Sequence, residues 1–388
     1  MDLTTDRGAL SGVLVADFSR VLAGPLASML LADFGATVIK VESPGAGDDT
    51  RHWGPPHVGS MSTYYASVNR NKRSVTLDLT DPADRALAHE LARRADVLVE
   101  NFKPGKLAAF GLGEPALRAA NPGLVYCSIS GFGAAGGADR PGYDFVAQAV
   151  GGLMSITGTR DGGPTKVGVA LVDVITGLHA VIGIQAALRE RDRTGAGQLV
   201  EVNLLSSLLA SLVNQAAGYL NGGGVPGPTG NAHPSIAPYE PLSTRDGQLA
   251  VAVGNDRQFR ALAGVLGRPE LAEDERFATN PARVRHRGVL VAELESVLST
   301  ADAAHWSDRL RAAGVACGPV NDLAGAFALA TELGLDPVAT LTAAGTGAEI
   351  ATVANPVRLS ATPPRYRLAP PELGADSADI RSWLATPA

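Results

Sequence analysis

The stretch VADFSRVLAGPLASMLLADFGATVIKVE, residues 15–42, contains the pattern that decides the fold. The apolar run at 12–18 is typical of a strand buried on both faces, and TVIKV at 37–41 predicts a second such strand. Between them, Pro25 falls in the first turn of a predicted helix over 23–34. A strand, a helix and a second strand in this order indicate a parallel sheet with crossover helices.

The same alternation continues downstream. After a long Gly/Pro-rich loop that begins at Ser43, we expect a helix over 82–95, and Asp81 before it has the side chain of an N-cap. Further strands are expected at 74–79, 96–99 and 124–128. Strands that alternate with helices predict the α/β class, with a mainly parallel, doubly wound sheet.

Region 143–222 differs, because its pattern predicts successive helices. They are expected at 143–154, 174–191 and 202–219. The segment NGGGVPGPTG (221–230) is rich in turn residues and marks a domain boundary. We therefore expect a large domain over 1–222, which residues 331–388 complete, and a small α+β domain over 223–330.

The composition excludes several classes of protein. The 388 residues are 45% hydrophobic and 19% charged, as in a folded chain of one or two domains. The formal net charge of −6 disfavours nucleic acid as a partner, which needs a concentrated basic surface. Cys127 and Cys317 form no disulfide framework and have no metal-ligand spacing, so we expect no metal site. Without a leader-like N-terminal segment or a long uninterrupted apolar stretch, we expect a cytoplasmic protein that binds no membrane.

Asp173 is conspicuous for its place in GVALVDVITGLHA (168–180), between an apolar run and a predicted helix. One interpretation is an N-cap that accepts the backbone N–H of Ile175 or Thr176. The other is a nucleophile, because the helix dipole holds a carboxylate at a helix N-terminus in its ionised form. The two interpretations are compatible, and Asp144 shares the ambiguity at the start of another predicted helix.

Two further features suggest other chemistry. Residues 131–136 (GFGAAG) match G-x-G-x-x-G after a predicted strand. A turn follows them instead of a helix, and the acidic residue that would bind a ribose is missing, which disfavours a nucleotide-dependent dehydrogenase. His179 fits a packed helix position, whereas His233 lies in a loop and is a candidate site residue.

Seven motifs follow one another along most of the chain. They are the 15–42 stretch, NKRSVTLDL (71–79), ADVLVENFKPG (95–105), GYDFVAQAVGGLMSITG (142–158), VGVALVDVITGLHAVIGIQAAL (167–188), GNAHPSIAPYEPLSTRDG (230–247) and GVACGPVND (314–322). In this order they resemble the class III CoA-transferase family, which includes formyl-CoA transferase, carnitine CoA-transferase and α-methylacyl-CoA racemase. The resemblance implies a Rossmann-like large domain, a smaller domain and a homodimer whose two subunits interlock like rings.

The resemblance places the family's catalytic aspartate at Asp173. It implies that this carboxylate attacks the thioester carbonyl of an acyl-CoA, giving a mixed anhydride and then an aspartyl-CoA thioester, and that an incoming acid reverses the steps. Backbone N–H groups of a glycine-rich loop are expected to stabilise the oxyanions. CoA is then a substrate, and no tightly bound cofactor is expected. The expected partners are acyl-CoA, small carboxylic acids and a second copy of the chain.

The other site residues also come from the resemblance. The acyl pocket is expected to contain Tyr143, Asp144, Gly230 and His233. CoA contacts are expected at Val21, Ala23, Lys72, Arg73, Leu77, Asn101, Phe102 and Lys106. Most of these follow predicted parallel strands, at whose carboxyl ends open sheets bind ligands. Ala109 replaces an Arg of many family members, and we expect Lys106 to take over that contact.

Tyr143 separates two branches of the family. The racemase branch has His at this place, paired with the aspartate equivalent to Asp173, whereas a tyrosine with a pKa of about 10 is a poor base near neutrality. A CoA-transferase is therefore favoured. A 2-methylacyl-CoA racemase and a non-catalytic CoA-binding protein are the alternatives.

The sequence gives limited information about the acids. Arg140, Arg160 and Lys166 lie near the motifs and could pair with a second carboxylate. The loop at 230–247 resembles that of members that act on dicarboxylic acids. Both features favour a dicarboxylate such as succinate as donor or acceptor.

Overall fold

The computed structural model describes residues 8–344 and 347–386, and the chain divides into two compact units. Unit 1 contains the residues up to Leu153, residues 167–224 and the C-terminal residues from Leu335, and unit 2 contains residues 154–166 and 225–334. Residues 1–7 lie outside the described residues. They are part of the N-terminal segment for which the sequence predicts no leader.

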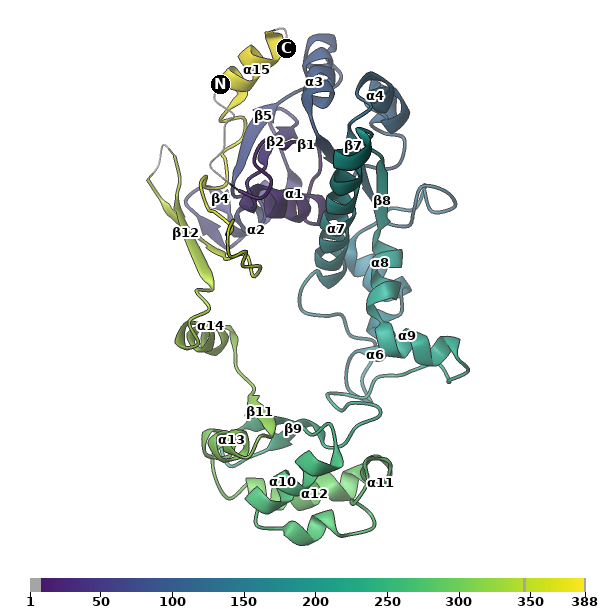
Figure 1. Cartoon of the computed structure of the whole chain (residues 1–388), viewed down its shortest axis with the longest axis vertical. Helices are drawn as coiled ribbons and strands as arrows, with labels where there is room; N and C mark the ends of the chain where they lie inside the picture. The colour runs from purple at the N-terminus through teal and green to yellow at the C-terminus, as the bar shows by residue number, and fades with distance from the viewer. Residues whose placement is uncertain (1–7, 345–346, 387–388) are drawn as a thin grey trace. The chain divides into compact units, whose positions relative to one another are not determined.

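A parallel sheet of six strands forms the centre of unit 1, in the order β5-β2-β1-β6-β7-β8 (Figure 1). The strands are β1 (Leu14–Asp17), β2 (Thr37–Glu42), β5 (Lys72–Thr76), β6 (Val97–Glu100), β7 (Val125–Ser130) and β8 (Leu199–Asn203). Numbered along the chain, this is the order 3-2-1-4-5-6 of a doubly wound Rossmann sheet. The expected α/β class is confirmed, and the strand order reverses between β1 and β6.

The edge strand β8 is a departure from the sequence prediction. The apolar pattern predicts a helix from residue 202, but Leu199–Asn203 pairs in parallel with β7. Asn203 is the point of change, because its Oδ1 accepts the N–H of Ser206 at 2.8 Å and caps α8 (Leu204–Ser211). The helical interpretation is therefore wrong for the first residues of this region, where LVEVN alternates as a strand at the edge of a sheet does.

Helices cover both faces of the sheet (Figure 1). On one face, α1 (Ala23–Asp33) and α7 (Leu171–Thr194) pack on strand residues such as Val15. On the other face, residues such as Ala16 belong to one apolar cluster with residues of α3, α4 and α15. These three helices span Pro82–Arg94, Glu114–Ala120 and Ser377–Ala385. Neighbouring side chains point to opposite faces of a strand, so β1 contributes to both apolar layers.

The helices α1 and α7 approach each other closely at one glycine. A Cβ on Gly177 would lie 2.7 Å from the carbonyl oxygen of Ala23, so a larger residue would push the two helices apart. By length and composition α7 is apolar enough to cross a membrane. Its buried face instead packs in the apolar layer beneath the sheet, as the core helix of a globular unit does. The close contact fixes Asp173, one turn before Gly177, relative to the start of α1.

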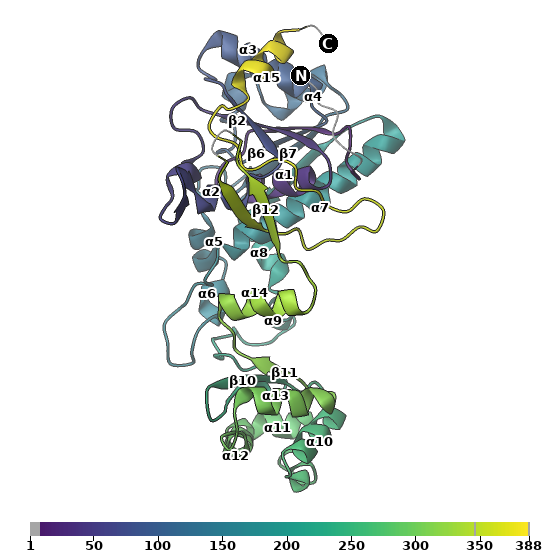
Figure 2. The ribbon, with the colours of Figure 1, turned by 90° about the vertical axis from the view of Figure 1, so that its left-hand side faces the viewer.

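The C-terminal segment returns to the sheet of unit 1. Arg381 on α15 forms an ion pair with Asp84 on α3, with a distance of 2.7 Å between Nη1 and Oδ1. Just before α15, an Asp376 carboxylate oxygen accepts the N–H of Ser74 on β5 at 2.9 Å. Figure 2 shows α15 beside α3 at this end of unit 1.

The remaining elements of unit 1 lie in connections and in the C-terminal segment. They are η1 (Asp49–His52), β3 (His57–Val58), β4 (Met61–Ser62), α2 (Thr63–Ser67), η2 (Ala108–Phe110), α5 (Asp144–Val150), α9 (Val213–Leu220), β12 (Val338–Thr342) and β13 (Glu349–Val353); α6 (Leu153–Ile156) falls at the junction of the units. The long loop after Ser43 thus contains short elements, and its side chains reach the carboxyl edge of the sheet.

Unit 2 contains a three-stranded antiparallel sheet in the order β11-β10-β9. Its strands are β9 (Tyr239–Ser243), β10 (Gln248–Ala252) and β11 (Ala316–Pro319), and its helices are α10 (Asp256–Val265), η3 (Pro269–Ala272), α11 (Asn280–Arg285), α12 (Arg287–Leu298), α13 (Ala303–Ala312) and α14 (Leu323–Glu332). Buried residues of the sheet, such as Leu249 and Val251, share one apolar core with helix residues such as Phe259 and Leu294.

Candidate active site

A cavity of about 290 Å³ lies where the strand order of the sheet reverses. Its wall comes from the segments that follow β1, β6 and β7 and from the first turn of α7. The expected site residues that line it are Val21, Ala23, Asn101, Phe102, Tyr143 and Asp173. Open α/β sheets bind ligands at such a reversal, outside the carboxyl ends of the strands.

The segment after β1 is fastened to the segment after β6. The Oδ1 atom of Asn101 accepts the N–H of Arg20 at 2.8 Å, and its Nδ2 atom donates to the carbonyl oxygen of Arg20 at 2.6 Å. The guanidinium of Arg20 lies 5.2 Å from the centroid of the Phe102 ring. Asn101 therefore shapes the wall of the cavity, because both polar atoms of its side chain hold the backbone.

Asp173 is the third residue of α7, which begins at Leu171. Its expected role as the N-cap is wrong, because the N-cap is Ala170, whose side chain cannot accept a hydrogen bond. Asp144 on α5 caps the helix instead, since its Oδ1 atom accepts the N–H of Val172 at 2.7 Å and that of Asp173 at 3.2 Å. The carboxyl of Asp173 is thereby left for the cavity.

The environment of Asp173 favours its protonated form. Burial raises the pKa of Asp173 from 3.8 to about 7, and the negative charge of Asp144 contributes to the rise. The helix dipole acts in the opposite direction but does not offset these two effects. The expectation that the dipole holds this carboxyl ionised is therefore corrected: near pH 7 the free protein contains both forms. A pKa near neutrality is typical of groups that react.

Asp144 is itself held in place by Gln148. The Nε2 atom of Gln148 donates to Oδ2 of Asp144 at 2.6 Å, and its Oε1 atom accepts the N–H of Val167 at 2.9 Å. Both Asp144 and Gln148 are buried. Asp144 thus acts on the site through the first turn of α7 and through its charge.

Tyr143 reaches the cavity by way of a tight loop between β7 and α5. A Cβ on Gly131 would lie 2.6 Å from the Cα of Gly142, and only glycines permit this contact between two backbones. No helix forms at GFGAAG (131–136), as the sequence predicts, because α5 begins only at Asp144. The exposed ring of Tyr143 lines the cavity.

A second cavity, of about 200 Å³, lies along the same edge of the sheet. Arg20 and Phe102 line both cavities. The wall of the second cavity includes Val41, Leu77 and Leu79, and the expected role of Leu77 as a CoA contact stays a prediction. An apolar slot of this kind accommodates a flat ring.

Three cations line the first cavity, and two of them are paired. Arg20 lies 3.2 Å from Asp49 (Nη1 to Oδ2), and Lys103 lies 3.0 Å from Asp139 (Nζ to Oδ1). The guanidinium of Arg140 has no hydrogen-bond or ion-pair partner among residues 8–344 and 347–386. Its positive charge is therefore available to an anionic ligand.

Lys72 does not face a cavity. It is buried, and its Nζ atom donates to Oδ2 of Asp17 at 3.0 Å and, at 2.9 Å, to the Pro25 carbonyl and to Oδ1 of Asn69. These three bonds use all the hydrogens of the ammonium. The expected contact of Lys72 with a CoA phosphate is corrected by this geometry, in which Lys72 supports the sheet edge from within.

Four other expected residues are not among the residues that line these two cavities. Arg73 forms an ion pair with Asp376, with 3.1 Å between Nη1 and Oδ1, and Lys106 is exposed on the segment after β6. Gly230, with a φ of 66°, and His233 belong to unit 2. The roles of these four residues stay predictions.

Tyr64 on α2 is close enough to Asp173 and Asp144 to be affected by their charges, and the sequence gives no expectation for it. Burial and the negative charges of Asp173 and Asp144 raise the pKa of Tyr64 to about 12. Its phenol therefore stays protonated and is able to donate a hydrogen bond. Tyr64 lies in a segment without a periodic pattern, so the sequence gives no signal for it.

Two of the weaker sequence signals can also be located. The Nδ1 atom of His179 lies 3.1 Å from Oγ of the buried Ser207, which agrees with a packed role. In the part of the chain that the structure describes, no three His, Cys, Asp or Glu side chains are grouped so that they could hold a metal ion.

The chain is similar in sequence and in fold to known proteins. The model of CoA-transferase family III matches residues 10–377. The chain is 45% identical to the succinate–glutarate CoA-transferase of Agrobacterium fabrum, over 99% of this chain and 98% of that one. It is 40% identical to the acetyl-CoA:oxalate CoA-transferase of Acetobacter aceti, over 98% and 97% of the two chains. The crystal structure of a CAIB/BAIF family protein from Brucella suis is similar with a TM-score of 0.86 and 43% identity, over 98% of this chain and 100% of that one.

Proposed function

Because the chain belongs to CoA-transferase family III, it is a CoA-transferase, and we propose that it moves CoA between dicarboxylic acids with Asp173 as the nucleophile. One observation carries the assignment of the nucleophile: a partly buried carboxyl with a pKa of about 7 lines the cavity at the reversal of the sheet. The relatives named for succinate, glutarate and oxalate support dicarboxylic substrates.

The proposed reaction has four displacements. The Asp173 carboxylate attacks the thioester carbonyl of the donor, which forms a mixed anhydride and releases CoA thiolate. The thiolate attacks the aspartyl carbonyl, which forms an aspartyl-CoA thioester and releases the donor acid. The acceptor carboxylate attacks this thioester and frees the thiolate again. The thiolate finally attacks the acceptor acyl carbonyl, so that the new acyl-CoA leaves and Asp173 is regenerated.

A carboxyl suits this chemistry because an anhydride stays as activated as the thioester, whereas a serine ester would hold the acyl group at lower energy. Partial burial of Asp173 also limits the hydration of its carboxylate, and a poorly hydrated carboxylate is a stronger nucleophile. No proton needs to move in these displacements, so the reaction requires only that Asp173 be ionised at the first step.

Arg140 supports the choice of dicarboxylic acids. It lines the cavity that Asp173 lines, and its guanidinium is unpaired among the described residues. A guanidinium binds a carboxylate through two parallel hydrogen bonds. We place the second carboxylate of the acyl group at Arg140, while its thioester carbonyl meets Asp173.

The proposed CoA site follows the carboxyl edge of the sheet. Val21 and Ala23 would contact the pantetheine arm beside Asp173, and Leu77 and Phe102 would flank the adenine in the apolar second cavity. Cations of this edge would meet the phosphates. In this proposal the reacting atoms come from acyl-CoA, which binds as a substrate, and the reaction needs no tightly bound cofactor.

We also propose a homodimer in the cytoplasm. Large apolar side chains are exposed on α9, where Val213 is 68% and Leu220 77% exposed, and on α14, where Leu323 is 78% exposed. Exposed apolar residues of this size are typical of surfaces that another chain covers. Light scattering on the purified protein tests this part of the proposal, and a monomer would contradict it.

The chemistry is tested by trapping. The protein is mixed with succinyl-CoA and then with hydroxylamine, which converts an aspartyl-CoA thioester into a hydroxamate that mass spectrometry assigns to a residue. We expect the hydroxamate on Asp173, and loss of transfer from succinyl-CoA to glutarate in Asp173→Ala. Robust transfer by Asp173→Ala would eliminate the proposed nucleophile. Exchange of solvent deuterium into the α-carbon of a 2-methylacyl-CoA without an acceptor acid would instead favour a racemase.

A further inference from the structure

The backbone that lines the first cavity is strained at Val21. This residue has a φ of 71°, in the left-handed region, which a β-branched residue adopts only as an outlier. Val21 is one of the expected CoA contacts and lines the cavity beside Asp173. A conformation that is disfavoured by about tenfold or more persists only where the surrounding structure enforces it.

Side chains hold the backbone N–H and carbonyl groups of Ser19 and Arg20, the two residues that precede Val21. The N–H of Ser19 donates to Oδ1 of Asp17 at 2.9 Å, and its carbonyl oxygen accepts from Nζ of Lys40 at 2.9 Å. The N–H and the carbonyl of Arg20 are both bound by Asn101. Five successive backbone groups, up to the N–H of Val21, are thus fixed by side chains.

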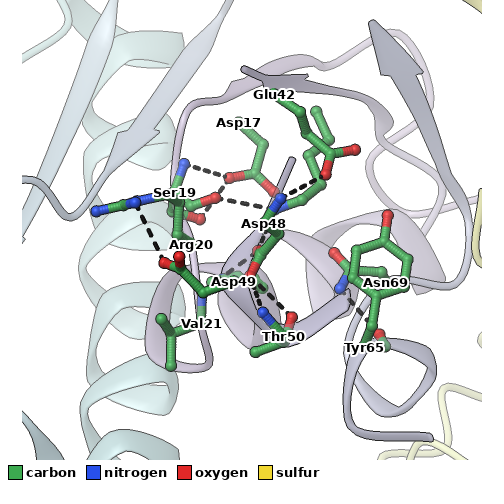
Figure 3. Close-up of polar contacts among 12 residues, drawn as sticks. Asp17, Ser19, Arg20, Val21, Glu42, Asp48, Asp49, Thr50, Tyr65 and Asn69 are labelled. Atoms are coloured by element: carbon green, nitrogen blue, oxygen red, sulfur yellow. Dashed lines mark hydrogen bonds and ion pairs between the residues drawn. The ribbon is translucent and has the colours of Figure 1, made fainter. Parts of the chain in front are cut away.

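Asp48 holds the last of these groups, at the strained residue itself. The N–H of Val21 lies 3.2 Å from Oδ1 and 3.3 Å from Oδ2 of Asp48. The same carboxylate accepts the N–H and the hydroxyl of Thr50, at 3.0 and 2.8 Å, and pairs with Lys40 at 2.9 Å. Figure 3 shows Asp48 between Val21 and Thr50, within a network that continues to Asp17 and Glu42.

The network around Asp48 is rigid because it is buried. Asp48 is 1% exposed, and its ion pair with Lys40 has no exposed side-chain surface. The N–H of Asp48 in turn donates to Oε2 of Glu42 at 3.0 Å, and Arg51 binds Glu42 through two nitrogens. These contacts hold the Asp48 carboxylate against the Val21 N–H.

We propose that Asp48 is a positioning residue for acyl-CoA, which acts by holding Val21 in its left-handed conformation at the wall of the cavity. The inference rests on the proposed CoA site. Without the carboxylate, Val21 relaxes to ordinary backbone geometry and the wall that meets the pantetheine arm loses its shape. Asp48 touches no substrate in this proposal, and its effect is on the binding of acyl-CoA and not on the reaction of Asp173.

The variant Val21→Gly distinguishes a role of Asp48 in holding the backbone of residue 21 from a general role in stability, because glycine adopts a positive φ at no steric cost and does not need Asp48 to hold it. Asn has one acceptor oxygen for the four groups that donate to the Asp48 carboxylate, so we expect Asp48→Asn to release the Val21 N–H and to raise the KM for succinyl-CoA about tenfold while kcat stays within about twofold. In the Val21→Gly background the same substitution should raise KM by less than about threefold. Val21→Gly alone removes a side chain of the proposed CoA site and is expected to raise KM by itself, so the effect of Asp48→Asn in this background is measured relative to Val21→Gly.

The control is Asp33, which is equally buried and pairs with Arg70 at 2.7 Å but does not contact Val21. Asp33→Asn should lower thermal stability without the change in KM, and Val21→Gly should not modify its effect. If Asp48→Asn does not fold, Thr50→Val is used in its place, because this substitution removes the hydrogen bond from the Thr50 hydroxyl to Asp48 and leaves the ion pair of Asp48 with Lys40. We then expect a smaller rise in KM, which Val21→Gly abolishes.

Two results overturn the inference. One is an unchanged KM in the folded Asp48 or Thr50 variant, and the other is a rise in KM that Val21→Gly leaves undiminished. Failure of the proposed function looks different, because the unaltered protein would then neither bind succinyl-CoA nor transfer CoA.

Discussion

Replacement of Asp144 by Asn should move the pH dependence of the reaction toward acid. In the native protein the Asp144 carboxylate caps α7 and also places a negative charge near Asp173. Asn keeps an oxygen that can accept the N–H groups of Val172 and Asp173, but it carries no charge. The pKa of Asp173 should therefore fall in Asp144→Asn.

The size of the change follows from the two causes of the raised pKa. Asp173 rises from 3.8 to about 7, and burial is the larger cause, with the charge of Asp144 second. The charge thus accounts for less than half of the rise, and we expect its removal to lower the pKa by about one pH unit, or about 1.4 kcal/mol. The lost bond from Gln148 to the second oxygen of Asp144 should cost about 1 kcal/mol of stability.

The assay is kcat/KM for succinyl-CoA as a function of pH, which reports the ionisation of the free enzyme. Because Asp173 must be ionised to attack, activity should rise with pH around a midpoint near 7 in the native protein and near about 6 in Asp144→Asn. Asp81→Asn is the matched control: Asp81 caps α3 through the N–H groups of Ala83 and Asp84, both at 2.9 Å, and lies outside the site. An unchanged or higher midpoint in Asp144→Asn would refute the electrostatic coupling.

Three other outcomes are expected. Above pH 7, the free energy of unfolding of Asp173→Asn should exceed that of the native protein by about 2 kcal/mol, after allowance for the partial exposure of Asp173; below about pH 4 the two should be equal. The reason is that the pKa of Asp173 is raised in the folded state, so the stability of the native protein falls as the pH rises from 4 toward 7. A difference in stability that does not change with pH would contradict this. Arg140→Gln should raise the KM for glutarate about tenfold or more but leave acetate unaffected, and an equal effect on both acids would exclude a role in binding the second carboxylate. Gly177→Ala should cost about 1–3 kcal/mol in urea unfolding, whereas Gly218→Ala, where a Cβ meets nothing within 4 Å, should be neutral or stabilising; equal effects would mean that the contact with Ala23 is relaxed.

The sequence predicts the sheet well because its inner strands are buried on both faces. The first strands and helices lie within a few residues of their expected positions, and α3 begins after the Asp81 cap. The edge strand Leu199–Asn203 is missed because only one of its neighbours is a strand and a helix follows it without a break. Local pattern carries no information about which neighbour an edge strand will have.

The site is less predictable because its chemistry depends on burial. The pattern predicts that a helix begins near Asp173, but the cap that belongs to Asp144 and the resulting pKa require contacts between α5 and α7. Lys72 looks like a surface cation in the sequence and is an internal partner of Asp17 in the structure. Tyr64 and Asp48 come from a segment without periodicity, where only the fold brings them to the sheet edge.

The dependence of Asp173 on Asp144 and on burial has a practical consequence. Each element alone would present an ordinary aspartate that titrates near 4, so the proton affinity of this one side chain reports whether the whole unit has assembled. A preparation with native helix content but loosened packing would show an acidic titration there. The pKa of Asp173, measured for example by NMR of a labelled aspartate, would therefore show which variants keep native packing around the site before any substrate is added.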